Sequence, residues 1–103
     1  MERSAEQQRV VLDAVRRSDA GVPAQARPVG VVTRVYAESE LETDSQRTTA
    51  AAAGRTAVAE EIEGRWPGIP FVVRSGTGAD LGAAVPEAGS GDEVVVGVAY
   101  RPV

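Results

Sequence analysis

Apolar residues recur at intervals of three and four between residues 43 and 66, the spacing that places side chains on one face of an α-helix. Thr43 and Gln46 have the capping-box spacing, in which a hydroxyl and an amide side chain satisfy backbone N–H groups at a helix start. Gly64, and then Pro67 and Gly68, are typical of a helix end. We therefore predict one long amphipathic helix whose buried stripe consists of Ala51, Gly54, Val58, Ile62 and Trp66.

Three shorter stretches have the β-branched, aromatic or alternating pattern of strands, namely residues 29–37, 71–74 and 93–100. In the first stretch we assign the odd positions to the core, which leaves Val32, Arg34 and Tyr36 on the opposite face. The third stretch is almost continuously apolar, as in a strand that is central or covered on both faces. Gly97 in its middle indicates a bulge or a closely approaching backbone.

The order of these elements predicts an α+β fold, or a small α/β fold. We expect a two-layer sandwich in the order α-β-α-β-(short α or loop)-β, with a mixed sheet of three to four strands and the long helix packed on one face. The first two strands flank the long helix, so they should run parallel as neighbours or near neighbours in the sheet.

The 103 residues are expected to form a single domain. It would consist of an N-terminal helix at about residues 4–18, a linker at 19–28 and an α/β core at 29–103. Ser4 and Gln7 give the first helix its own capping box. That helix could dock on its own domain or on a neighbouring copy. Residues 75–91 contain five glycines and predict a long connection, with either a short helix before Pro86 or a hairpin arm.

The chain contains no histidine, cysteine or lysine. This excludes imidazole and thiolate nucleophiles, Cys/His zinc sites and disulfides, and it favours a non-catalytic protein without a cofactor. A net charge of −4 argues against nonspecific nucleic-acid binding. No long apolar run or signal-peptide core is present, so we expect a cytoplasmic protein that does not enter a membrane.

Each predicted strand carries one arginine toward its C-terminal end. With the alternation assigned above, all three arginines share the face away from the long helix, beside a tyrosine and several aliphatic residues. The first helix could cover this face. Alternatively, the face could be a subunit interface or could bind a carboxylate or phosphate. The candidate interface residues are Arg34, Tyr36 and Arg101, and the third arginine is Arg74.

Gly76, Thr77 and Gly78 follow a predicted strand and precede another glycine, Gly82. Glycine-rich turns between a strand and a helix can present backbone N–H groups to phosphate. With Arg74 beside them, these residues form a candidate anion or nucleotide site. A flexible loop is the competing interpretation, and the chain lacks a P-loop lysine.

Carboxylates alternate along the stretch between the first strand and the long helix, at Glu38, Glu40, Glu42 and Asp44. They form either a solvated helix entry or part of a cation loop, although an EF-hand glycine and its bidentate glutamate are missing. We therefore assign no metal site. A general base at Glu38 or Glu40 would need a buried carboxylate with a raised pKa.

Taken together, the sequence favours a small non-catalytic cytoplasmic interaction or oligomerisation module. We expect a homo-oligomer, most simply a dimer formed through the sheet face or the first helix, and a separate protein partner is possible. The alternative is a small-anion or nucleotide-binding domain that uses Arg74, Gly76, Thr77 and Gly78.

Overall fold

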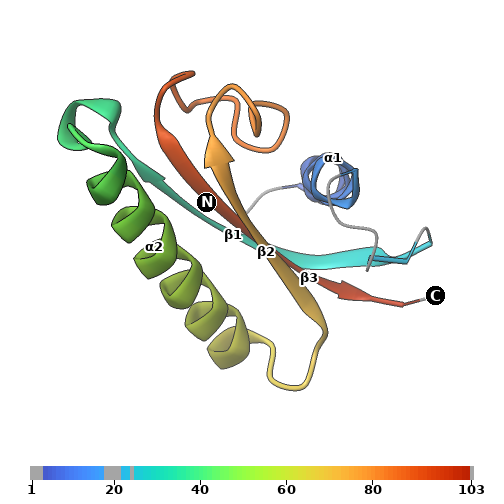
Figure 1. Cartoon of the computed structure of the whole chain (residues 1–103). Helices are drawn as coiled ribbons and strands as arrows, with labels where there is room; N and C mark the ends of the chain where they lie inside the picture. Colours follow the sequence, from blue (N-terminus) through green and yellow to red (C-terminus); the bar gives the residue numbers. More distant parts are fainter. Residues whose placement is uncertain (1–3, 18–21, 24, 103) are drawn as a thin grey trace.

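The protein is an α+β domain in which three strands are packed between helices (Figure 1). The computed structural model describes residues 4–17, 22–23 and 25–102. The fold class predicted from the sequence is confirmed. The elements are α1 (Ala5–Arg16), β1 (Arg27–Tyr36), the 3₁₀ helix η1 (Glu38–Glu40), α2 (Asp44–Arg65), β2 (Phe71–Thr77) and β3 (Glu93–Arg101).

The sheet has the strand order β1-β3-β2, and β3 is antiparallel to both of its neighbours. The first two strands therefore run parallel to each other, as predicted for near neighbours, with β3 inserted between them. This is a split β-α-β arrangement. The prediction of a mixed sheet was wrong, because every hydrogen-bonded pair is antiparallel. The central position predicted for the third strand is confirmed.

Helix α2 begins and ends through local signals. Thr43 and Gln46 form the predicted capping box, with the Gln46 N–H donating to the Thr43 hydroxyl at 3.1 Å. At the other end Gly64 remains helical, contrary to our expectation, and Gly68 is the residue with positive φ, at 79°. The turn between α2 and β2 thus places its left-handed residue at a position where glycine carries no Cβ penalty.

Helix α2 covers one face of the sheet (Figure 1). Val58 and Ile62 from the helix pack on Val32 of β1 and on Val95 and Ala99 of β3. Two glycines allow the close approach. A Cβ on Gly54 would lie 2.7 Å from Val95, and a Cβ on Gly97 would overlap the side chains of α2.

Helix α1 and the long connection before β3 cover the other face, so the sheet has helices on both sides and the structure is not a simple two-layer sandwich (Figure 1). The α1 residues Val11, Leu12 and Val15 are fully buried here. The connection adds apolar residues that seal the same cluster, Leu81, Ala84 and Val85. Both faces of β3 are covered as a result, which explains why its sequence is almost continuously apolar.

The predicted linker at 19–28 is only partly described, because residues 18–21 and 24 lie outside the described part of the chain. Val22 and Ala26 are buried in the α1 cluster, and β1 begins at Arg27, inside the predicted linker. These residues therefore contribute to the domain core as well as connecting α1 to it.

The face assignment predicted for the first strand was wrong. The even residues Val32 and Tyr36 pack toward α2, whereas Val31 lies on the α1 side and Val35 is 43% exposed. Both sets of alternate positions contain valine, so the alternation itself was ambiguous. Arg34 lies on the even face, where its long side chain reaches solvent instead of blocking the packing of α2.

Candidate functional site

The three strand arginines do not share one face. Arg34 is paired with Val95, which faces α2, whereas Arg74 is paired with Val96, which faces α1. Arg101 has the same parity as Val95 along β3 and therefore falls on the α2 side. The mixed cationic face predicted from the sequence is thus divided between the two sides of the sheet.

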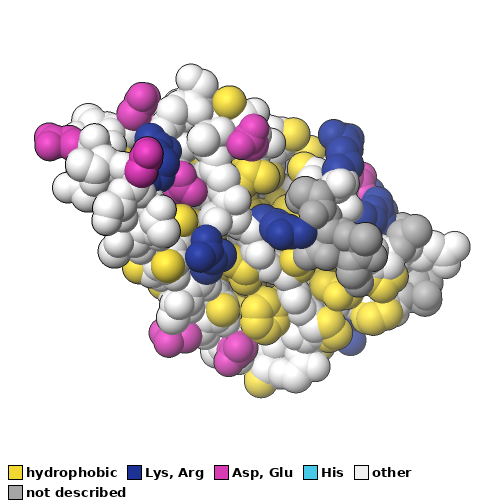
Figure 2. All heavy atoms as spheres, in the orientation of Figure 1, with side chains coloured by type: hydrophobic (Ala, Val, Ile, Leu, Met, Phe, Trp, Pro, Cys, Tyr) yellow, Lys and Arg dark blue, Asp and Glu magenta, His cyan; other side chains and the backbone are white. Residues whose placement is uncertain are grey.

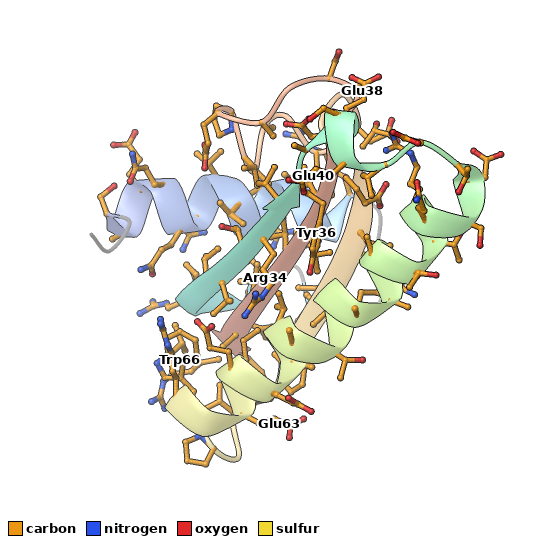
Figure 3. All side chains as sticks on the ribbon, turned by 90° about the vertical axis from the view of Figure 1, so that its left-hand side faces the viewer. Arg34, Tyr36, Glu38, Glu40, Glu63 and Trp66 are labelled. Carbon is orange, nitrogen blue, oxygen red and sulfur yellow. The ribbon has the colours of Figure 1, made fainter. Side chains whose placement is uncertain are left out.

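Arg34 and Tyr36 lie on the α2 side of β1 (Figure 3). The Tyr36 ring packs into the α2 cluster, close enough to Gly54 that a Cβ there would lie 3.0 Å from the ring. Helix α2 therefore covers the part of this sheet face on which Tyr36 lies, whereas Arg34 remains exposed.

The glycine turn after β2 uses its backbone donors internally. The Gly78 N–H donates to the Asp92 carbonyl at 2.9 Å and the Ala79 N–H to the Ser90 carbonyl at 3.1 Å. The next two N–H groups, of Asp80 and Leu81, both donate to Thr77. The predicted short helix is replaced by turns. These four donors are therefore committed within the fold and do not point at a ligand as a phosphate-binding turn requires.

An open cleft of about 440 Å³ lies between α1, β2 and this turn. Arg17 and Arg74 line it together with the carboxylate-bearing Asp80, and the rest of the lining is mainly small or apolar. Figure 2 shows that arginine side chains on this side of the molecule are spread out, some of them beside acidic side chains, and do not gather into one basic patch. The predicted ligand residue Arg74 thus borders a hollow, but an acidic residue borders it too.

The alternating carboxylates lie at the surface. Glu38 and Glu40 are exposed in η1, so neither has the buried environment that a general base with a raised pKa would need. Across the described residues, no three potential ligands come together in a group that could hold a metal ion.

Asp92 has the one perturbed carboxyl group found in this region of the described chain. Its carboxylate accepts hydrogen bonds from the Glu38 N–H and the Gly89 N–H, both at 2.9 Å. These bonds, with a smaller contribution from the positive charge of Arg47, hold the pKa of Asp92 below its ordinary value of 3.8. These hydrogen bonds tie the β1–α2 connection to the β2–β3 connection, so Asp92 has a structural role.

The outer edge of β1 is the feature that the sequence analysis missed. Just beyond the ends of β2, the Gly78 N–H donates to the carbonyl of Asp92, and the N–H of Tyr100 in β3 donates to the carbonyl of Pro70. The hydrogen-bonded pairs between β2 and β3 are therefore those of even residues with even residues. Backbone N–H and C=O groups point to alternate sides along a strand, so the odd residues of β3 point their groups toward β1. They form hydrogen-bonded pairs there with the even residues of β1. The backbone groups of Val31, Thr33 and Val35 therefore point outward.

Val35 and Val10 are the exposed large aliphatic residues in the described part of the chain, at 43% and 47% exposure. Val35 lies on the β1 edge. Val10 lies on α1, on the side away from the buried residues Val11, Leu12 and Val15. The β-branched sequence of β1 identified a strand, but strand order was needed to identify that strand as an edge.

The chain matches no protein-family model, no curated protein and no solved structure. None of the described helices is long and apolar enough to cross a membrane.

Proposed function

We propose that the protein is a small non-catalytic cytoplasmic interaction module that assembles as a dimer. The open edge of β1, with its exposed Val35, carries this proposal. An edge strand offers a row of backbone donors and acceptors to another chain, and natural proteins that remain monomeric usually protect such an edge.

The composition and the site geometry support a binding role over a catalytic one. Histidine, cysteine and lysine are absent from the sequence, and the carboxylates considered as a general base, Glu38 and Glu40, are exposed. The structure gives less support to the anion-binding alternative than the sequence did. The backbone donors of its turn are committed, and Asp80 would repel an anion in the cleft beside Arg74.

Solution mass measured by light scattering over a range of protein concentrations tests the proposal. We expect a mass that rises from that of one chain, 10.7 kDa, toward twice that value as the concentration increases. Arg34→Glu is a useful companion variant, because Arg34 lies on the α2 side and its side chain does not point along the edge. A monomer at every accessible concentration would rule out self-association.

A further inference from the structure

We infer that two copies of this chain pair through their β1 strands, antiparallel and centred on Thr33, to form one continuous six-stranded sheet. This inference rests on the proposed self-association and identifies the surface and the register.

The β2 edge is better protected than the β1 edge. The outward carbonyl of Thr77 accepts the N–H of Leu81 at 3.0 Å, where the chain turns back after the strand. Arg55 reaches from α2 to the hydroxyl of Ser75 at 2.6 Å. Along β1, by contrast, no backbone bond from another described residue reaches the outward groups of Val31, Thr33 or Val35.

An antiparallel strand can pair with its own copy around a twofold axis, which gives an isologous interface. When the axis passes through Thr33, Val31 of each copy faces Val35 of the other and Thr33 faces its counterpart. All three outward residues then form hydrogen-bonded pairs, with about six hydrogen bonds at two per pair. The exposed Val35 gains a β-branched cross-strand neighbour.

Shifted alignments are poorer. An axis through Arg34 places two arginines directly opposite each other, which is destabilising. An axis through Val32 or Val31 brings the irregular stretch at Pro28–Gly30 into the pairing, where the register of β1 against β3 already shifts. An axis through Val35 leaves Val31 without a partner strand. The alignment on Thr33 keeps the three outward residues clear of the irregular stretch and places the two Arg34 side chains diagonally instead of directly opposite each other.

Charge does not favour association in general, because each copy carries a net charge of −4. The match between the two edges is therefore one of backbone groups. With the axis through Thr33, the outward N–H and C=O groups of Val31, Thr33 and Val35 all meet partners on the other copy. The edge therefore fits a second copy of this chain.

The cysteine-free sequence permits a direct test by single-cysteine cross-linking. In the inferred dimer the two Cα atoms of residue 33 lie about 5.5 Å apart, which is within the range of about 4.4–6.8 Å that a disulfide spans. Thr33→Cys should therefore give a covalent dimer on mild oxidation. Two residues 35 would lie roughly 13 Å apart along the strands, so Val35→Cys should remain monomeric on a denaturing gel. Ser75→Cys, on the β2 edge, should do the same.

A second pair of variants tests the edge without oxidation. Val35→Lys should raise the concentration needed for half dimerisation, because lysine on an edge strand opposes pairing. Ala52→Lys adds the same charge at an exposed position of α2, on a helix that covers the opposite face from α1, and should leave that concentration unchanged. Far-UV circular dichroism confirms that each variant is folded.

The outcomes separate the two proposals. A wild-type dimer in which Thr33→Cys cross-links no better than Ser75→Cys overturns β1 pairing while self-association stands. Cross-linking of Val35→Cys in preference to Thr33→Cys overturns the register. A wild type that stays monomeric at all concentrations overturns both proposals.

Discussion

At the scale of single residues, two glycines set the distance between α2 and the sheet. Gly54 presents no side chain toward Val95, and Gly97 presents none toward Val58 and Ile62. At Gly64, further along the same helix, no atom apart from the neighbouring helix backbone lies within 4 Å of the place where a Cβ would stand. The same residue type therefore serves close packing at one position of α2 and has no packing role at another.

Substituting alanine at Gly54 and at Gly64 should distinguish the glycine needed for close packing from the one that is not. Gly64→Ala gains helix propensity and should stabilise the protein by up to about 1 kcal/mol. Gly54→Ala gains the same propensity but must displace the buried Val95, and overpacking of this kind costs about 1–3 kcal/mol. Urea unfolding of both variants measures the difference, and equal free energies of unfolding would contradict the close packing of α2 on β3.

Local signals were readable at this scale, whereas signals that depend on distant partners were not. Both capping boxes, at Ser4 and at Thr43, were predicted because all of their atoms lie within four residues. The use of the Gly78 N–H could not be predicted, because its acceptor is the carbonyl of Asp92. The candidate anion site was therefore overestimated from the sequence of its turn alone.

At the scale of elements, an ion pair joins the first turn of α2 to the start of β3. Arg47 donates to the Glu93 carboxylate at 3.2 Å, and the Glu93 side chain is only 8% exposed. The pair Arg65–Glu61 lies within α2 and is far more exposed, at 56% and 34%. The two pairs have similar geometry, and the burial of Glu93 makes the difference between them.

Arg47→Ala should leave a buried carboxylate without its partner and destabilise the protein by about 1–3 kcal/mol. Arg65→Ala removes a surface ion pair and should cost less than about 1 kcal/mol. It also removes a contact between Arg65 and the Trp66 ring, an interaction that is weak at exposed sites. Thermal or urea denaturation at low ionic strength checks both values. If Arg65→Ala proved the more damaging, the anchoring role of Arg47 would be refuted.

The two connections at one end of the sheet are joined by Asp92, which gives a prediction for acid stability. Its pKa is lowered in the folded state, so its contribution to stability is present above the ordinary value of 3.8 and is lost as the pH falls through the lowered value. Asp92→Asn removes this contribution. The melting temperature of the variant should lie below that of the wild type near neutral pH, and the gap should narrow as the pH falls below about 4. A gap independent of pH would show that the charge is not responsible.

Element types and order followed from the sequence, but the faces of β1 did not. The continuously apolar sequence of β3 made this buried strand recognisable, and the three- and four-residue spacing of apolar residues in α2 made its buried stripe recognisable. In β1, valines occupy both sets of alternate positions, and the choice between them depends on which helix covers which face. Helix packing is a long-range property that the alternation within one strand does not encode.

At the scale of the whole molecule, two apolar clusters lie on opposite sides of one small sheet. The cluster under α1 includes Val11, Leu12 and Val15, so the N-terminal helix is part of the domain core in this chain and is not a detachable arm. With both faces covered, the open boundaries of the sheet are its edges. The interaction surface that we propose is accordingly narrow and made largely of backbone, which favours a partner strand over a small ligand.

The position of β3 in the middle of the sheet also determines when the domain can fold. β3 follows all other elements in the sequence, yet β1 and β2 are both hydrogen-bonded to it and to no other strand of the described chain. While the chain is being synthesised, neither strand has a pairing partner until residues 93–101 have left the ribosome. The apolar residues of β1 and β2 stay exposed until then, a state in which chains aggregate most readily. A premature stop before β3 would therefore remove the centre of the sheet and leave two strands that cannot pair.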